Sequence, residues 1–212
     1  MVFSDHMLFD GAAKAKHLLV LAHGAGAPMD SPFMTAFAEG LAKNKIRLAR
    51  FEFPYMQRRR AEGTKRPPDR GPKLEAAWHE VVAELRQGMP KQGKIIIGGK
   101  SMGGRIASMI AEEASVDGLV CLGYPFHPPG KPEKTRTEHL AALKTPTLIV
   151  QGTRDALGTI DDVKAYKLSK AIKLHWLEDG DHSFKPRKAS GRTEQQNWDE
   201  GIAAVARFVL NV

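Results

Sequence analysis

The sequence has few features of an exported or membrane-bound protein. It contains a single cysteine, Cys121, which excludes an internal disulfide and fits a reducing compartment. Its longest apolar runs, such as 17–22 and 94–99, are far shorter than the roughly 20 residues that a membrane-spanning helix needs. The N-terminus lacks the basic region, apolar region and cleavage site of an export signal. We therefore expect a cytoplasmic protein without a membrane partner.

Patterns that would indicate a metal or a cofactor are also missing. The histidines lack the spacing of a metal-ligand set, and Cys121 has no second cysteine beside it. No repeat, low-complexity segment or linker divides the 212 residues, of which 42% are hydrophobic. A chain of this length and composition can bury one substantial core. We expect one domain, 1–212, that needs no cofactor and exists as a monomer or homodimer.

Positive charge, in contrast, is abundant and unevenly placed. The formal net charge is +8, and segment 57–73 holds seven Lys or Arg residues against two acidic residues. Nucleic acid is an unfavoured partner, because this segment contains no aromatic residue and no helix-turn-helix or zinc pattern is present. Two interpretations stay open: a solvated basic loop, or a rim that attracts an anionic substrate.

Apolar runs of strand length alternate with amphipathic stretches of helix length. The runs are continuous in Ile, Val and Leu, which is typical of parallel strands covered on both faces. The sequence therefore predicts a three-layer α/β/α sandwich with a mostly parallel sheet of about six strands. The expected strands cover 17–24, 46–54, 94–99, 118–126, 145–152 and 173–179, and the expected helices cover 31–43, 73–88, 101–114, 161–171 and 194–210.

Four glycines surround Ser101 in segment 98–104, which fits two different motifs. A phosphate-binding loop would need a glycine five residues before Gly99, but Lys94 stands there and strand-like residues follow it. The G-x-S-x-G turn instead needs small residues two before and two after the serine, as Gly99 and Gly103 provide. The following helix would direct its N-terminal N–H groups toward a developing oxyanion. The motif therefore predicts Ser101 as a nucleophile.

A base and an acid for this serine should lie beyond the carboxyl ends of other parallel strands. Asp155 lies just beyond the strand expected at 145–152, and His182 lies just beyond the strand expected at 173–179. We expect Asp155 to orient the His182 imidazole and His182 to act as general base for Ser101.

Other carboxylates are alternatives for the acid. Asp161 and Asp162 more readily start the helix expected at 161–171, where carboxylates offset free N–H groups. Asp179 and Asp181 flank the histidine and have the character of turn residues. Asp155 is therefore preferred.

Two backbone N–H groups should stabilise the oxyanion of an acyl-transfer reaction. One follows the nucleophile, at Met102. The second is expected from the glycine-rich loop 23–28, with Ala25 as the candidate, although such a loop can also be only a tight turn.

Residues at other strand ends are candidates for the substrate pocket. His23 precedes the glycine-rich loop and is expected to shape this turn rather than to accept a proton. His127 ends another strand, and Tyr55 and Met56 follow a third, where core or rim packing is the alternative. The remaining histidines are expected to be structural or exposed: His6, His17, His79, His139 and His175.

Six stretches carry a family resemblance: LLVLAHGAG, FEFPYM, GGKSMGGR, YPFHPPGKP, LIVQGTRD and GDHSF. They resemble the α/β-hydrolase superfamily, and most of all its small lid-less serine hydrolases related to dienelactone hydrolases. The likeness runs from about residue 17 to the C-terminus. It implies Ser101, Asp155 and His182 as nucleophile, acid and base, in the chain order of that superfamily.

The sequence departs from the full superfamily pattern in several ways. Dienelactone hydrolases proper carry a cysteine at the nucleophile position, so their specific reaction is not implied for a chain with Ser101. The strand leading to His23 begins close to the N-terminus, so the first two, antiparallel strands should be shortened or absent. Cap domains usually enter before the strand at Leu148, where only 127–146 is available here. We expect a minimal α/β-hydrolase fold with an open, shallow cleft and no cap domain.

These observations predict a serine hydrolase of the carboxylesterase or thioesterase type that cleaves a small ester or thioester through an acyl-enzyme. An anionic substrate would be favoured if Arg58, Arg59 or Arg60 faced the cleft. The alternative is a non-catalytic binding or scaffold protein of the same fold, because a fold does not guarantee a function.

Overall fold

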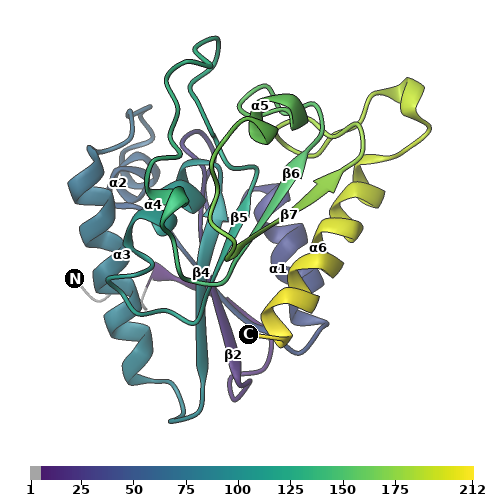
Figure 1. The fold of residues 1–212 in the computed structure, drawn as a ribbon. Helices are drawn as coiled ribbons and strands as arrows, with labels where there is room; N and C mark the ends of the chain where they lie inside the picture. Colours follow the sequence, from purple (N-terminus) through teal and green to yellow (C-terminus); the bar gives the residue numbers. More distant parts are fainter. Residues whose placement is uncertain (1–5) are drawn as a thin grey trace.

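Seven strands form one sheet in the order β1-β3-β2-β4-β5-β6-β7 in the computed structural model, which describes residues 6–212 (Figure 1). Neighbouring strands pair in parallel except at one edge, where β1 is antiparallel to β3. The prediction of a mostly parallel sheet is confirmed, with β1 added to the six expected strands. The strands are β1 (Leu8–Asp10), β2 (His17–Ala22), β3 (Arg47–Phe51), β4 (Lys94–Lys100), β5 (Gly118–Leu122), β6 (Thr147–Gly152) and β7 (Ile172–Leu177).

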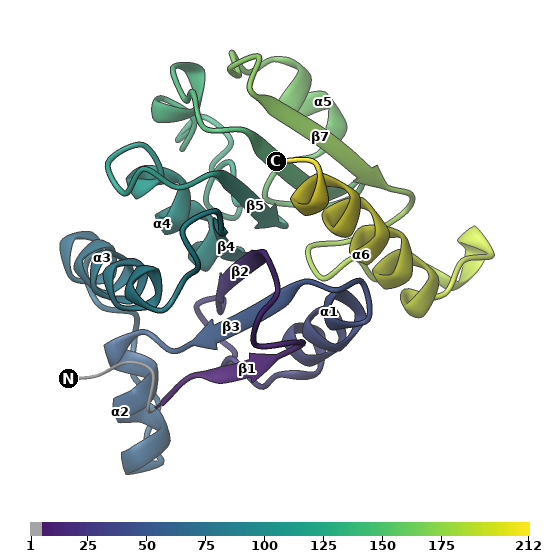
Figure 2. The same ribbon diagram turned by 90° about the horizontal axis from the view of Figure 1, so that it is seen from below.

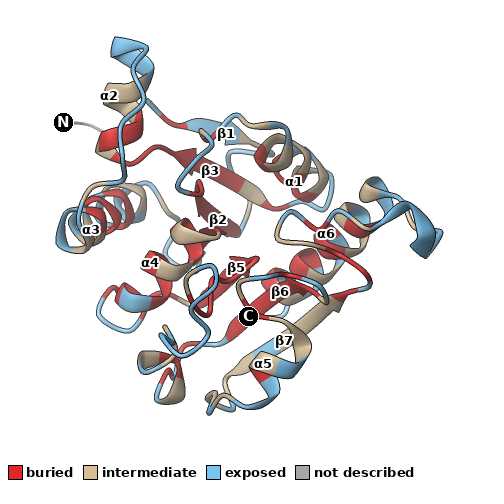
Figure 3. Cartoon of the chain, turned by 90° about the horizontal axis from the view of Figure 1, so that it is seen from above, coloured by how far each residue is buried: buried red, intermediate tan, exposed pale blue. Residues whose placement is uncertain are grey.

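Helices cover both faces of the sheet. One face carries α1 and α6, and the other carries α3 and α4 (Figure 2). The strands β2, β4, β5 and β6 are buried nearly along their whole length (Figure 3), as expected for parallel strands rich in Ile, Val and Leu. The helices are α1 (Pro32–Ala42), α2 (Pro54–Glu62), α3 (Gly71–Gln87), α4 (Met102–Ile110), α5 (Ile160–Lys164) and α6 (Glu194–Leu210), with 3-10 turns at His139–Ala141 and Lys188–Ser190.

Helix α1 illustrates how sequence spacing produces this layer. Pro32 stands at its first turn, where the missing N–H costs no hydrogen bond. The buried residues Met34, Phe37 and Leu41 recur at helical spacing and therefore form one apolar stripe. This stripe packs with Val205 and Val209 of α6 in one core cluster.

The segment after β3 differs from the prediction. The strand ends at Phe51 rather than at residue 54, and Pro54 begins α2, so half of the basic segment 57–73 is helical. Helix α2 ends at Gly63, whose φ of 67° is favourable for glycine. Most of α2 is polar, which hid the helix from hydrophobic periodicity. Helix α5 is also shorter than the 161–171 expected.

Two features of the described part bear on partners. Within residues 6–212, no helix combines the length and apolar character that crossing a bilayer requires. The same residues contain no group of three or more His, Cys, Asp or Glu side chains that could hold a metal ion. Cys121 is buried in β5, and this burial raises the pKa of its thiol.

Candidate active site

Ser101 occupies a strained turn between β4 and α4. Its φ of 51° and ψ of −115° lie outside the regions that a side chain favours. The turn is pressed against the end of β2: a Cβ at Gly99 would lie 2.2 Å from the Ala22 carbonyl oxygen, and one at Gly103 would lie 2.5 Å from the same atom. The two glycines of the motif are therefore required by close backbone contact.

A continuous chain of hydrogen bonds leads from this serine to a buried carboxylate. His182 Nε2 lies 2.9 Å from Ser101 Oγ, and His182 Nδ1 lies 2.7 Å from Asp155 Oδ2. Asp155 is fully buried and also accepts hydrogen bonds from Gln151 Nε2 and the Leu157 N–H, each at 2.9 Å. A carboxylate only accepts, so His182 donates from Nδ1 and leaves Nε2 free to accept the serine proton.

The three residues come from neighbouring positions on the carboxyl edge of the sheet. Ser101 follows β4, Asp155 follows β6 and His182 follows β7. In the sheet only β5 separates β4 from β6, and β7 is next to β6. The structure thus brings together the three residues selected from the sequence, although 81 positions separate Ser101 from His182.

The alternative carboxylates have other partners. Asp162 completes a capping box with Thr159 at the start of α5. Asp179 binds Arg187, which lowers the pKa of this carboxyl. Asp181 accepts the N–H groups of its own turn. These contacts are the cap and turn roles that the sequence indicated.

Ala25 and Met102, the two residues expected to supply the oxyanion N–H groups, line the same cleft as Ser101. Met102 is the first residue of α4, and it lines one cleft together with Ala25 and Ser101. Tyr55 Oη donates to the Ala25 carbonyl oxygen at 3.0 Å and thereby holds the glycine-rich loop in place. The side chain of Tyr55 therefore supports the glycine-rich loop, and the glycine content of the loop alone did not indicate this contact.

The four candidate pocket residues are buried and do not line the cleft that contains Ser101. His23 is fully buried; its Nε2 accepts the Phe53 N–H at 3.1 Å, and its Nδ1 lies 2.6 Å from the Gly24 carbonyl oxygen. Burial lowers the pKa of His23, so it serves the turn as a neutral imidazole.

Tyr55 and Met56 belong to α2, and their side chains are buried in the core. His127 is buried against the Pro128 carbonyl oxygen and lies 3.7 Å from Asp162. Among the described residues, the cleft that contains Ser101 has a volume of about 300 Å³ and none of these four candidates in its wall. Its lining residues are Ala25, Pro68, Asp69, Gly71, Leu74, Ser101, Met102, Arg105, Ile106, Pro125, Arg136 and Leu157.

The arginines at the start of the basic segment also point elsewhere. Arg58 binds Asp69 at 2.8 Å, and Arg59 donates to the Gly26 carbonyl oxygen at 3.3 Å. Arg60 binds the carboxylates of Glu52 and Asp30. None of the three arginines lines the cleft with Ser101, which removes the basis for an anionic substrate bound by these side chains.

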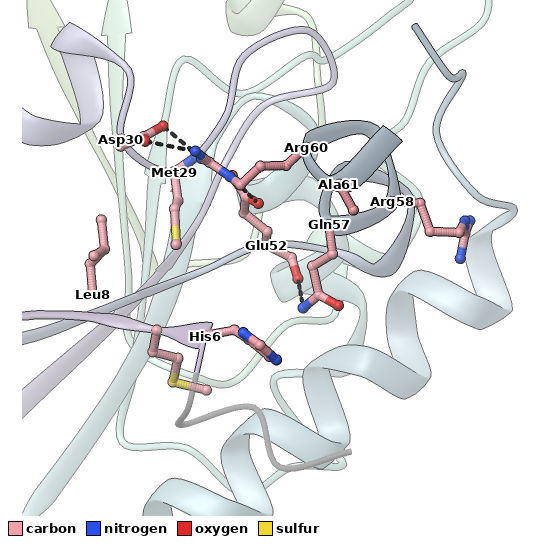
Figure 4. Close-up of a pocket in the computed structure, with 10 residues that line it drawn as sticks. His6, Leu8, Met29, Asp30, Glu52, Gln57, Arg58, Arg60 and Ala61 are labelled. Atoms are coloured by element: carbon pink, nitrogen blue, oxygen red, sulfur yellow. Dashed lines mark hydrogen bonds and ion pairs between the residues drawn. The ribbon is translucent and has the colours of Figure 1, made fainter. Parts of the chain in front are cut away.

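A second hollow, of about 610 Å³, lies between α2 and β1. Figure 4 shows Arg60 held between Asp30 and Glu52 on one side of it, with Arg58 directed away from them. The hollow borders His6, where the described part of the chain begins, and contains no residue of the Ser101–His182–Asp155 chain. It is therefore separate from the candidate active site.

Lys100, directly before the serine, supports the histidine loop. Its Nζ donates to the His182 carbonyl oxygen at 2.6 Å and lies 5.5 Å from the ring centre of Phe33. Gly123, with a φ of 67°, leaves room for the ammonium group, because a Cβ there would lie 2.9 Å from Nζ. Burial lowers the pKa of Lys100 to about 8, although Asp155 opposes this shift.

Lys100→Met should change how stability depends on pH. The folded pKa of about 8 lies below the ordinary lysine value of 10.5, so between these values the unfolded wild type binds more protons than the folded one. The free energy of unfolding of the wild type should therefore rise relative to Lys100→Met as pH increases through this window, by on the order of 3 kcal/mol in total. Urea unfolding of both proteins at several pH values measures this difference. A difference that stays constant, or falls, would show that Lys100 is not desolvated as described.

Comparisons with known proteins agree with this architecture. A model of the α/β-hydrolase domain family matches residues 15–210. An α/β serine hydrolase homologue from Coxiella burnetii superposes with a TM-score of 0.72 at 18% identity, covering 95% of this chain and 89% of that chain. A lid-less α/β serine hydrolase from Xanthomonas campestris superposes with a TM-score of 0.71 at 18% identity. The match covers 96% of this chain and 88% of that chain. A dienelactone hydrolase from Anabaena variabilis superposes with a TM-score of 0.72 at 18% identity. The match covers 97% of this chain and 90% of that chain. At this identity the structural likenesses establish the fold alone.

Proposed function

The chain belongs to the α/β-hydrolase domain family, and from this premise we propose that it is a serine hydrolase that cleaves a small carboxylic ester or thioester. Ser101 is the nucleophile, His182 the general base and Asp155 the carboxylate that orients the histidine. The observation that carries this proposal is the unbroken hydrogen-bond chain Ser101–His182–Asp155. A strained serine at a helix N-terminus gives it further support.

The first half of the reaction transfers the acyl group to the enzyme. Ser101 Oγ attacks the substrate carbonyl carbon while His182 Nε2 takes the hydroxyl proton. The carbonyl oxygen becomes an oxyanion that accepts hydrogen bonds from the Met102 and Ala25 N–H groups. The bond to the leaving alcohol or thiol then breaks, and His182 gives its proton to the leaving atom. The product of this half is an acyl-enzyme on Ser101.

The second half repeats the same steps with water. His182 Nε2 takes a proton from a water molecule, whose oxygen attacks the acyl carbonyl carbon. The second tetrahedral intermediate collapses, Ser101 Oγ recovers the proton from His182, and the carboxylic acid leaves. Asp155 keeps Nδ1 protonated throughout, so His182 Nε2 exchanges the proton in both halves of the reaction.

The size of the cleft supports a small substrate. Its volume of about 300 Å³ is at the lower end of the range for small-molecule sites. The connection from β5 to β6 contains a single 3-10 turn, at His139–Ala141, and forms no cap domain. An uncapped cleft suits a substrate taken from water rather than from a lipid interface.

Labelling with a fluorophosphonate probe tests the proposal. We expect the wild type to form a covalent adduct on Ser101, and we expect labelling to fall about 1,000-fold or more in His182→Ala, because the hydroxyl loses its base. Trypsin cuts after Lys100 and Arg105, so mass spectrometry assigns an adduct on peptide 101–105 to the only serine there.

Ser108, on the helix α4 that follows Ser101, and His139, in the 3-10 turn at His139–Ala141, provide a matched control. Ser108 Oγ lies 2.8 Å from His139 Nε2, but this pair has no third, carboxylate member among the hydrogen bonds of the described residues. His139→Ala should therefore leave labelling of Ser101 unchanged, and no adduct should form on Ser108. A folded wild type that forms no adduct would instead favour the non-catalytic binding or scaffold function.

A further inference from the structure

Two arginines line the cleft that contains Ser101. Arg105 lies one turn further along α4, about 6 Å along the helix axis, and its N–H donates to the Ser101 carbonyl oxygen at 3.0 Å. Arg136 comes from the connection between β5 and β6. Its backbone is fixed there, because its N–H donates to Phe126 at 2.7 Å and its carbonyl oxygen accepts from Tyr124 Oη at 2.9 Å. Backbone hydrogen bonds thus fix the main chain of both residues at the cleft.

Neither arginine has a carboxylate partner among residues 6–212. The other charged residue of the cleft wall, Asp69, is bound by Arg58 at 2.8 Å and by Lys73 at 3.3 Å. Arg105 Nε is buried and has no hydrogen-bond acceptor in the described part of the chain. A buried donor without an acceptor costs about 1–3 kcal/mol. Such an atom, in a cleft beside a nucleophile, points to a ligand that accepts.

The two positive charges also lie close enough to act on each other. Burial and the charge of Arg105 both lower the pKa of Arg136. Two guanidinium groups without a counter-ion repel, whereas an oxyanion between them would accept paired, charge-assisted hydrogen bonds. The pair therefore has the composition of an anion-binding site.

The position of the pair shows which part of the substrate would reach it. In the proposed reaction the leaving atom must lie at His182, which gives it a proton. The lining residues of the cleft with Arg105 and Arg136 do not include His182. We therefore assign the acyl part of the substrate to this cleft.

We propose that Arg105 and Arg136 bind an oxyanionic group, a carboxylate or a phosphate, on the acyl chain of the substrate. This inference rests on the proposed function and narrows it to esters and thioesters with an anionic acyl group.

Three matched esters test this substrate class: the 4-nitrophenyl monoesters of adipic acid, of its terminal amide, and of 5-phosphonopentanoic acid. We expect kcat/KM for at least one anionic ester to exceed that for the uncharged amide about tenfold or more. Each anionic ester gives one ratio of its kcat/KM to that of the amide. The larger ratio shows whether the site prefers a carboxylate or a phosphate-like group. In Arg105→Gln and in Arg136→Gln the ratio of kcat/KM for the preferred anionic ester to kcat/KM for the amide should fall about tenfold.

Arg66→Gln is the matched control, because Arg66 is exposed and already paired with Glu62. It should keep the wild-type preference, since surface ion pairs contribute little. Equal kcat/KM for all three esters in the wild type would overturn the proposal. So would an anionic preference that survives both arginine variants.

Binding to a protein without the nucleophile separates this proposal from the proposed function. In Ser101→Ala, adipate and inorganic phosphate should be compared as ligands by the rise in Tm that they produce. A rise that is lost when Arg105→Gln or Arg136→Gln is added supports the anion site even if no ester is cleaved. No rise with either anion, together with hydrolysis of the amide ester by the wild type, would contradict the anion site and leave the hydrolase in place.

Discussion

Asp155→Asn is expected to lower kcat for a small ester about 10,000-fold. Asp155 Oδ2 now accepts the Nδ1 proton of His182, so Nε2 is free to accept from Ser101. An asparagine amide group at this place would donate to Nδ1, and the imidazole proton would move to Nε2. Nε2 could then no longer accept the serine proton. Steady-state hydrolysis of a 4-nitrophenyl ester measures the loss.

Asp162→Asn is the control for this experiment. Asp162 is a carboxylate seven positions further along the chain, in the first turn of α5, where it accepts hydrogen bonds from Thr159. Its replacement should leave kcat within about twofold, with a loss of stability of about 1 kcal/mol from the weakened cap. If Asp162→Asn lowered kcat and Asp155→Asn did not, the orienting acid would have been assigned wrongly.

Gly103→Ala is expected to destabilise the protein by about 3 kcal/mol or more. Alanine is a better helix former than glycine by about 1 kcal/mol, so helix propensity alone predicts the opposite sign. The added Cβ, however, would lie 2.5 Å from the Ala22 carbonyl oxygen and 2.7 Å from that of His23. Both are backbone atoms at the end of β2, so neither can rotate away. Urea unfolding monitored by circular dichroism measures the change.

Gly40→Ala gives the matched comparison in α1. A Cβ at Gly40 would approach Cδ1 of the buried Ile202 in α6 to 2.7 Å and its Cγ2 to 3.0 Å, but these are side-chain atoms and not backbone atoms. The isoleucine can adopt another rotamer, so the change in unfolding free energy should stay within about 1 kcal/mol. Equal effects of the two substitutions would mean that backbone contact at Gly103 does not determine the turn.

Much of the fold could be predicted because its signals are local. The continuous Ile, Val and Leu runs of β2, β4 and β6 indicate strands buried on both faces whatever the rest of the chain does. The residues of the Ser101–His182–Asp155 chain could be selected because each directly follows a strand and such ends meet at one edge. Their catalytic roles remain a proposal.

The features that the sequence did not predict depend on contacts between distant segments, which sequence spacing does not show. Helix α2 lacks a long apolar stripe, and only Pro54 at its start and Gly63 at its end could have indicated it. His127 and Tyr55 follow β5 and β3 within a few residues, much as Ser101, Asp155 and His182 follow their strands, yet His127 and Tyr55 are buried. Arg105 and Arg136 became notable only because the structure places both on one cleft without a carboxylate partner.

The order in which the sheet can assemble limits when this site can exist. Ser101 follows the central strand β4, whereas His182 follows β7, the edge strand, which pairs only with β6. Parallel pairings between distant segments are among the slower events in folding, because loop entropy is lost before contacts form. The contact between Ser101 and His182 can form only after β7 has joined the sheet. Recovery of hydrolysis after dilution from denaturant would therefore follow the completion of this edge, while circular dichroism would also register the earlier formation of helices.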